Sequence, residues 1–328
     1  MARTATYREA LYEALREEMT DDSSVIMLGE DFSNGGAFGV AGDLPERFGP
    51  ERVVRTPISE NGFVGVAVGA AMTGMRPVAE IMFMDFMTLA MDQIVNHAAK
   101  IGYMYANQYQ VPLVVRTPAG AGRGYGASHS QSLEGWLIQV PGLKVVAPSD
   151  PADAKGLLKS AIRDDNPVVF IENKLLYPKA GVIEDDAPAI PLGKARRRRA
   201  GRDLTIVSYG RMLDMSLEAA EVLAAEGIEC EVIDLRTLKP LDIDTVAESV
   251  GRTGRFVFVE EGTGGVGATV SAAVVERCLG ALVGKPVRVA ARDVPIPSSG
   301  PLEQRVIPQL ADIVEGCLES LQPIEGQG

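Results

Sequence analysis

The chain has 328 residues, enough for two domains of ordinary size, and a formal net charge of −12. A hydrophobic share of 46% and a charged share of 23% are typical of a globular protein. The acidic balance argues against nucleic acid or an anionic membrane surface as a partner, and no apolar run reaches the roughly 18 residues of a membrane span. Three scattered cysteines and an N-terminus without a hydrophobic signal region favour the cytoplasm.

Helices and strands alternate in the first half. Apolar residues at helical spacing predict a helix over 6–19, and the apolar run 25–28 predicts the next strand. The same patterns predict helices at 62–74, 88–105 and 151–163, and strands at 78–83, 113–116, 143–147 and 168–171. Such alternation implies parallel βαβ units, so we expect an α/β domain over 1–180, with helices flanking a parallel sheet.

A stretch rich in Pro, Asp, Gly and Arg predicts an interdomain linker over 181–200. We interpret its basic run, Arg196 to Arg199, as a solvated charge cluster rather than a nucleic-acid site. A second alternating series predicts a smaller α/β domain over 201–328. Its strands are expected at 204–207, 231–235, 256–260 and 287–289, and its helices at 213–226, 242–252 and 267–283.

Two glycine-rich segments invite a nucleotide-binding hypothesis. Gly262 to Gly267 match G-x-G-x-x-G after a predicted strand, but the acidic residue expected about 20 residues later is missing. We therefore interpret this segment as a turn onto a packed helix. The second segment, Gly120 to Gly126, lacks the Gly-Lys-Ser/Thr ending of a phosphate-binding loop and leads instead to His129.

The chain has only two histidines. His129 follows the glycine-rich loop at an expected sheet edge, where an imidazole can titrate near neutral pH and act on a substrate. From the residues alone, a structural role is an equal alternative. His97 lies inside the predicted helix 88–105 and is interpreted as structural.

Glu60 lies where an extended segment turns into a helix of small residues. A glutamate at a helix start is ordinarily a cap or a partner of the helix dipole. Gly65 and Gly69, however, would let another backbone pack closely, as at a subunit interface. A glutamate buried in such a crevice tends to keep its proton and to donate a hydrogen bond, so a catalytic role also stays open.

Ordered motifs over nearly the whole chain resemble one family. They are Thr56–Glu60, Glu80–Phe86, Asp92–Asn96, His129–Gln131, Pro141–Val146, Asp153–Leu158, Ala161–Pro167 and Asp234–Thr237. Together they resemble the beta subunits of the thiamine diphosphate-dependent first components of pyruvate, branched-chain 2-oxo acid and acetoin dehydrogenases. The resemblance implies a transketolase-like pyrimidine-binding domain followed by a transketolase C-terminal domain.

The resemblance also implies roles for matched positions. Glu60 would hydrogen-bond the pyrimidine ring of thiamine diphosphate and so help to remove a proton from the thiazolium carbon, and Phe86 would stack on that ring. Further cofactor contacts are implied at Glu30, Ile58, Ser59 and Met82. His129 would face the substrate and the incoming lipoyl group.

The resemblance implies two metal sites, one on this chain and one on a partner chain. Some family members hold a monovalent cation, potassium, at positions that match Leu113, Ala161, Ile162, Asp164 and Asn166. The Gly-Asp-Gly motif that holds magnesium and the diphosphate is missing, and Gly42-Asp43-Leu44 is the nearest approach. We therefore expect a separate alpha subunit to bind Mg²⁺, in an assembly of two alpha and two beta chains.

Two departures from the family leave the substrate open. Members commonly have Gly-Gly where this chain has Ala106-Asn107, and the segment 124–128 before His129 is unusual. The leading hypothesis is decarboxylation of a 2-oxo acid such as pyruvate, or cleavage of acetoin, with acyl transfer to the lipoyl domain of a dihydrolipoyl acyltransferase. The alternatives are a two-component thiamine enzyme with an aldehyde or sugar acceptor, and a non-catalytic scaffold.

Overall fold

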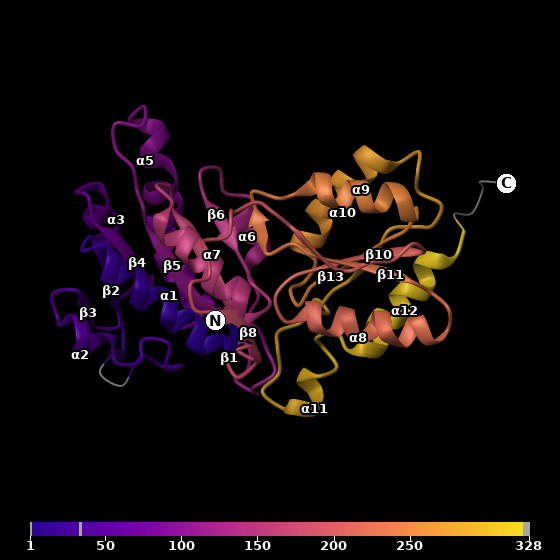
Figure 1. Ribbon diagram of the computed structural model, residues 1–328, viewed down its shortest axis with the longest axis horizontal. Coiled ribbons are helices and arrows are strands. Elements are labelled where there is room, and N and C mark those ends of the chain that lie inside the picture. Colours follow the sequence, from indigo (N-terminus) through magenta and orange to yellow (C-terminus); the bar gives the residue numbers. More distant parts are fainter. Residues whose placement is uncertain (1, 33–34, 324–328) are drawn as a thin grey trace. The chain divides into compact units, whose positions relative to one another are not determined.

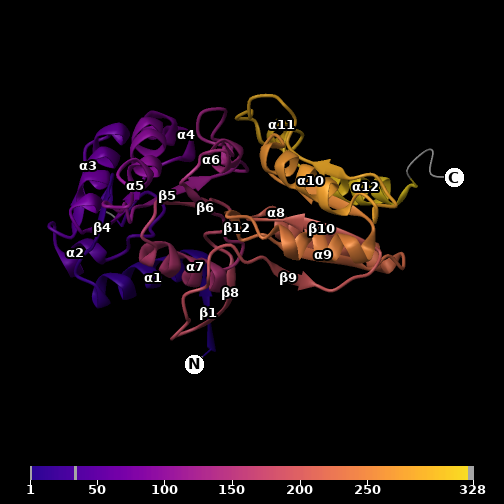
Figure 2. The same ribbon diagram turned by 90° about the horizontal axis from the view of Figure 1, so that it is seen from above.

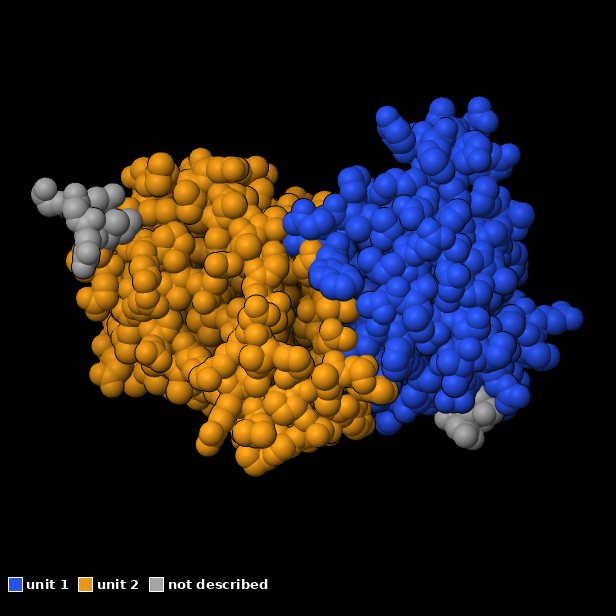
Figure 3. All heavy atoms as spheres, turned by 180° about the vertical axis from the view of Figure 1, so that it is seen from behind, with its two compact units in different colours: residues 1–119, 136–192 blue, residues 120–135, 193–328 orange. Residues whose placement is uncertain are grey.

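The computed structural model describes residues 2–32 and 35–323. The chain divides into two compact units (Figure 3). Unit 1 comprises 1–119 and 136–192, and unit 2 comprises 120–135 and 193–328. The glycine-rich loop that carries His129 therefore belongs to unit 2, although residues of unit 1 precede and follow it in the chain.

Unit 1 is an α/β unit built on a parallel sheet, in which the strands lie in the order β6-β7-β5-β4-β2-β3. Its elements in chain order are β1 (Ala2–Thr6), α1 (Tyr7–Asp21), β2 (Val25–Gly29), α2 (Leu44–Phe48), β3 (Val53–Arg55), α3 (Glu60–Met72), β4 (Arg76–Glu80), α4 (Met84–Met87), η2 (Thr88–Ala90), η3 (Asp92–Ala98), α5 (Ala99–Met104), β5 (Val114–Ala119), α6 (Glu134–Ile138, which begins in the segment of unit 2), β6 (Lys144–Val146), α7 (Pro151–Arg163), β7 (Val168–Asn173) and β8 (Ala180–Glu184).

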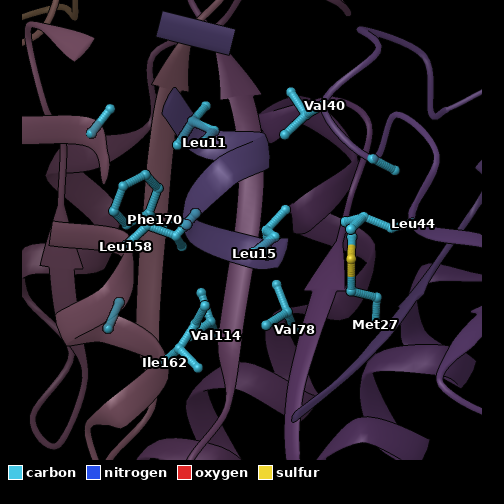
Figure 4. Packing of buried hydrophobic residues seen from close by; sticks show 14 of the residues in the cluster. Leu11, Leu15, Met27, Val40, Leu44, Val78, Val114, Leu158, Ile162 and Phe170 are labelled. Carbon is cyan, nitrogen blue, oxygen red and sulfur yellow. The ribbon is translucent and has the colours of Figure 1, made fainter. Parts of the chain in front are cut away.

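Helices cover both faces of this sheet. Figure 2 shows α1 and α7 on one side of β4 and β5 and α3 on the other. Because both faces are covered, the strands have continuous apolar sequences, and all five residues of β2 are buried. Figure 4 shows the packing on the α1 and α7 side, where Leu11, Leu15 and Leu158 meet Val78 and Val114 from the strands.

A buried ion-pair network joins three neighbouring strands of unit 1. The Arg116 guanidinium on β5 donates to Glu80 of β4 at 2.6 Å and to the two oxygens of Glu172 of β7 at 2.7 and 2.9 Å. Arg116 is only 1% exposed. Burial alone would lower the pKa of Arg116, but the carboxylates of Glu172 and Glu80 raise it above its ordinary value. The hydroxyl of Tyr177 also donates to Glu172, at 2.8 Å.

Unit 2 contains a second sheet, in the order β14-β13-β10-β11-β9. Figure 1 shows α9 and α10 on one side of β10, β11 and β13, and α8 and α12 on the other. The elements are β9 (Arg196–Arg199), β10 (Leu204–Ser208), α8 (Met212–Ala225), β11 (Cys230–Asp234), β12 (Thr237–Lys239), α9 (Ile243–Thr253), β13 (Phe256–Val259), α10 (Gly265–Cys278), β14 (Val287–Val289), α11 (Gly300–Glu303) and α12 (Leu310–Leu321).

The segment for which a linker is predicted contains two strands. β8 pairs antiparallel with β1, and β9, the run of four arginines, pairs antiparallel with β11. Arg197 and Arg198 form ion pairs with the buried carboxylates of Glu231 and Asp234 on that neighbouring strand. The arginine run is therefore an edge strand and not a solvated cluster in a linker, because acidic residues of β11 balance its charge.

The predicted helix 88–105 is irregular. It is a 3₁₀ turn, a π-helix and an α-helix in succession, η2, η3 and α5. Ala106 and Asn107 follow it with φ angles of 51° and 60°, the left-handed region. These are the two positions at which the resembled family commonly has Gly-Gly, so the departure carries a conformational cost of about 1–2 kcal/mol for the alanine.

Among the residues described, no helix combines the length and the apolar character needed to cross a membrane.

We expect Arg116→Met to lower the free energy of unfolding by about 3–5 kcal/mol, because it leaves two buried carboxylates without a counter-charge. Urea unfolding followed by the fluorescence of Trp136, the only tryptophan, measures this in unit 1. Arg47→Ala is the control, since both side chains of its ion pair with Asp43 are about half exposed and its loss should change the free energy of unfolding little. Equal effects of the two variants would refute a structural role of the network.

We expect Ala106→Gly to raise the free energy of unfolding by about 0.5–1 kcal/mol, because glycine adopts a positive φ without steric cost. Ala70→Gly, inside α3, should have the opposite effect and destabilise by about 1 kcal/mol. The same urea experiment compares them. Destabilisation by Ala106→Gly would contradict the left-handed conformation at this position.

Candidate active site

The predicted cofactor contacts of unit 1 follow neighbouring strands at one edge of the sheet. Glu30 comes directly after β2, and Met82 follows β4, which pairs with β2 in parallel. Glu60 begins α3 soon after β3, on the other side of β2. The amide of Thr56 donates to the carbonyl of Gly29 at 2.8 Å and holds the β3–α3 connection against the end of β2. The carboxyl edge of a parallel sheet is where such folds bind ligands.

Two buried carboxyl groups lie together at this edge. Glu30 and Glu60 are each 5% exposed. Burial, reinforced by the charge of Glu60, raises the pKa of Glu30 to about 7, and Asp31 and Glu80 act in the same direction. Oε1 of Glu30 is buried and has no hydrogen-bond partner among the described residues. A buried acceptor of this kind is ready for a ligand that donates or shares a proton.

The four other predicted contacts differ in exposure. Ser59 is the residue before α3, and its hydroxyl forms no cap hydrogen bond within the described structure. Ile58 is 81% exposed, whereas Met82 is 9% exposed. Phe86 lies in α4, half-buried, with its ring 6.2 Å from that of Phe83. The structure therefore places Glu30 and Glu60 near enough for the charge of Glu60 to raise the pKa of Glu30, and it leaves Ile58 and Ser59 exposed.

A pocket of about 390 Å³ opens beside the start of α3. Its walls come from β2, β3, their connection to α3 and the first turns of that helix: Leu28, Val54, Arg55, Thr56, Pro57, Ser59, Gly62, Phe63 and Val66. Mostly apolar walls with a few polar groups are typical of small-molecule sites.

His129 lies in unit 2, in the loop that follows β5. Four glycines of this loop have positive φ: Gly120, Gly122, Gly124 and Gly126. The amide of His129 donates to the carbonyl of Gly126 at 3.3 Å, and its Nδ1 is 3.1 Å from the hydroxyl of Ser128. The side chain is half-buried, so part of the imidazole is open to solvent.

A group of buried carboxyls in unit 2 was not predicted. Burial, together with the charges of the nearby Glu261 and Glu260, raises the pKa of Glu134 to about 8 against the lowering effect of its own backbone amide. Glu260 and Glu261 directly follow the buried strand β13. Two acidic residues at the carboxyl end of an apolar strand were the available signal in the sequence.

Glu260 also explains the glycine-rich turn 262–267. Its two carboxylate oxygens accept from the amides of Val266 and Gly267 in the first turn of α10, at 3.3 and 2.7 Å. A Cβ atom on Gly267 would lie 2.6 Å from Oε1 of Glu260. The glycines thus allow a side chain of the protein itself to bind the helix start, in agreement with a turn rather than a dinucleotide site.

The carbonyls of the predicted potassium site already interact with protein donors. Arg76 donates to the carbonyls of Ile162 at 2.8 Å and Asp164 at 2.9 Å. The carbonyl of Leu113 accepts from Val168, and that of Ala161 accepts from Asp164. A cation at these positions and at Asn166 would share two of the carbonyls with a guanidinium and two with backbone amides, and the site stays a prediction.

Comparison with known proteins extends over nearly the whole chain. Residues 3–179 match the transketolase pyrimidine-binding domain, and residues 193–313 match the transketolase C-terminal domain. A solved split-gene transketolase, described as an inactive beta4 tetramer, superposes with a TM-score of 0.76 at 26% identity, covering 96% of this chain and 97% of the other. The fold and the two domain matches thus define a transketolase-like protein, as predicted.

Relatives of known activity specify the family. The beta-2 subunit of the mitochondrial pyruvate dehydrogenase E1 component of Oryza sativa subsp. japonica is 47% identical over 96% of this chain and 86% of its own length. The beta subunit of an acetoin:2,6-dichlorophenolindophenol oxidoreductase of Cupriavidus necator is 46% identical over 98% and 99%. The chain belongs to the family of these beta subunits, which confirms the resemblance.

We expect the stability of unit 2 to fall as the pH rises from about 4.5 to about 8. The folded protein keeps the Glu134 proton up to about pH 8, whereas the unfolded chain releases it near the ordinary pKa of 4.5. The slope is at most about 1.4 kcal/mol per pH unit. Urea unfolding from pH 5 to pH 8, followed by circular dichroism, measures it.

Glu134→Gln should flatten this pH dependence, because the amide has no proton to lose. Glu276→Gln, on the exposed face of α10, is the matched control and should leave the slope unchanged. If Glu134→Gln follows the wild-type profile, the proton is not held by Glu134.

Proposed function

We propose that the chain is the beta subunit of a thiamine diphosphate-dependent 2-oxo acid dehydrogenase of the pyruvate or acetoin type. The observation that carries this proposal is the pair of buried carboxyl groups, Glu30 and Glu60, at the carboxyl edge of the parallel sheet of unit 1. The family supports it independently, since relatives from a plant and a bacterium are beta subunits with these activities.

The residues of unit 1 suit the aminopyrimidine half of thiamine diphosphate. The orphaned Oε1 of Glu30 and the Glu60 carboxyl provide buried oxygen atoms for ring nitrogens and the amino group, and Phe86 and Met82 provide apolar faces. When bound, the cofactor supplies a thiazolium carbon that adds to a ketone and accepts the electrons of the broken carbon–carbon bond. Glu60 would contact the pyrimidine ring, and Glu30, whose pKa burial and the charge of Glu60 raise to about 7, would keep a proton close by.

The diphosphate half requires another chain. The sequence has no Gly-Asp-Gly motif, so magnesium and the diphosphate are assigned to an alpha subunit in an assembly of two alpha and two beta chains. The exposed Ile58 and Ser59, beside the pocket at α3, suit a cofactor shared across a subunit interface. A potassium ion near Asp164 and Asn166 belongs to this proposal as a structural cation.

The acceptor is proposed to be the lipoyl group of a dihydrolipoyl acyltransferase, with His129 facing the incoming group. A two-component transketolase is the second candidate, favoured by the likeness to a split-gene transketolase. In that case the carbon unit passes to an aldehyde or a sugar, and lipoamide is not acylated.

The chain is tested after reconstitution with its alpha subunit, thiamine diphosphate and magnesium. We expect reduction of ferricyanide with pyruvate or acetoin, followed by acylation of a lipoyl domain. Glu60→Gln should lower both activities by about 100-fold or more, because an amide cannot exchange the proton that the pyrimidine ring needs. Activity is measured as rates with each acceptor.

Glu46→Gln, on the exposed part of α2, is the control for the charge change and should keep the wild-type rates. Wild-type rates in Glu60→Gln would remove Glu60 from the proposal. Turnover of a sugar phosphate without acylation of lipoamide would replace the dehydrogenase by the transketolase alternative.

A further inference from the structure

The loop 120–131, which carries His129, has little regular structure of its own. Its hydrogen bonds include those from Gly120 to the carbonyl of Gln131 and from His129 to the carbonyl of Gly126, both at 3.3 Å. Four of its residues are glycines with φ between 68° and 97°. Glycines give the unfolded loop many alternative conformations, so a defined position for His129 needs external restraints.

Two buried glutamates supply such restraints. The carboxylate of Glu303 accepts from the amide of Gly122 at 2.7 Å through Oε1 and from the amide of Gly124 at 3.1 Å through Oε2. The carboxylate of Glu261 accepts a short hydrogen bond from the amide of Ala121. Glu303 and Glu261 are 3% and 8% exposed, so these charge-assisted bonds form away from bulk water, where they are strongest.

Glu303 is itself held firmly. It is the last residue of α11, and its carbonyl accepts from the amides of Val306 and Ile307 at 3.0 and 3.2 Å. The amide of Arg292 donates to the carbonyl of Val306 at 3.0 Å and closes the base of the segment 292–306. The carboxylate therefore projects from a hydrogen-bonded segment rather than from a loose loop.

Close packing explains the glycines. A Cβ atom on Gly124 would lie 3.0 Å from the carbonyl oxygen of Ser298, in the same segment as Glu303. A Cβ atom on Gly126 would lie 3.5 Å from Cβ of Ser298. At Gly124 a side chain would crowd this carbonyl, whereas at Gly126 the contact would be ordinary and the positive φ is what favours glycine.

We propose that Glu303 and Glu261 are positioning residues, which fix the loop 120–131 and thereby the place of His129 in the acyl-transfer step. The inference rests on the proposed function only for the role of His129. The hydrogen bonds that fix the loop can be tested without any activity. Glu303 contributes more to this restraint than Glu261, because its two carboxylate oxygens accept hydrogen bonds from two amides of the loop.

Amide hydrogen exchange provides that independent test, on the complex reconstituted with the alpha subunit. Glu303→Ala should speed exchange of peptides covering 120–131 by about tenfold or more, and Glu303→Gln, which keeps one acceptor oxygen, should lie between it and the wild type. Gln304→Ala, the exposed neighbour at the end of α11, is the matched control and should leave the loop unchanged. Wild-type exchange in Glu303→Ala would overturn the inference whether or not the enzyme turns over pyruvate.

The kinetic test separates positioning from general damage. Glu303→Ala should lower kcat for lipoyl-domain acylation by about 100-fold, while ferricyanide reduction and the KM for the 2-oxo acid change by less than about threefold. In a His129→Ala background, Glu303→Ala should have no further effect, because it acts through His129. Equal losses with both acceptors, or an additive loss in the double variant, would show a merely structural role. Inactivity of the wild-type complex would refute the proposed function and leave the exchange result standing.

Discussion

The buried triad of Arg116, Glu80 and Glu172 is the constraint on which unit 1 depends. It joins β4, β5 and β7, the strands whose carboxyl ends continue into Met82 and Phe86, into the loop of His129 and into the end of β7. Polar groups so deep in a parallel sheet are tolerated only in a complete arrangement, because each missing partner leaves a charge without solvent. The network also fixes the register of the three strands, since a shift of one strand along its neighbour would move a carboxylate away from the guanidinium. The positions of Met82 and Phe86, the proposed cofactor contacts that follow β4, depend on that register.

Regular periodicity made most of the fold predictable. α1 and α7 have apolar faces at helical spacing, and β2 and β10 are uninterrupted apolar strands, so local sequence and tertiary burial agree. β9 was not predicted, because an arginine run has no strand pattern of its own. Its conformation is set by acidic residues of β11 about 35 positions later. The boundary between the units at the start of the glycine-rich loop was not predicted either, because nothing local indicates that residues 120–135 belong to unit 2.

The residues of the candidate site were likewise predictable only in part. Motifs in the sequence predicted Glu60 and His129, and the chemical roles of both residues remain proposals. The raised pKa of Glu30 depends on burial and on the charge of Glu60, which lies beyond β3 in the chain. The hydrogen bonds that Glu303 accepts from the loop span 181 and 179 residues. Contacts at such separations leave no local pattern, because they depend on how two segments meet and not on either segment alone. A position just after a strand was a hint for Glu30 and Glu261, whereas Glu303, at the end of α11, had no such signal.

The route of the chain through its units has a further consequence. The polypeptide passes from unit 1 to unit 2 at residue 120, returns at 136 and leaves again at 193. Neither unit is one uninterrupted stretch of sequence, so a fragment that begins at 193 would lack the loop of His129 and leave the carboxylates of Glu261 and Glu303 without their amide partners. Gene fission at the apparent interdomain junction is therefore not a neutral event for this protein. A split before residue 120 would keep this loop with the C-terminal piece, but it would also separate residues 136–192 from the rest of unit 1.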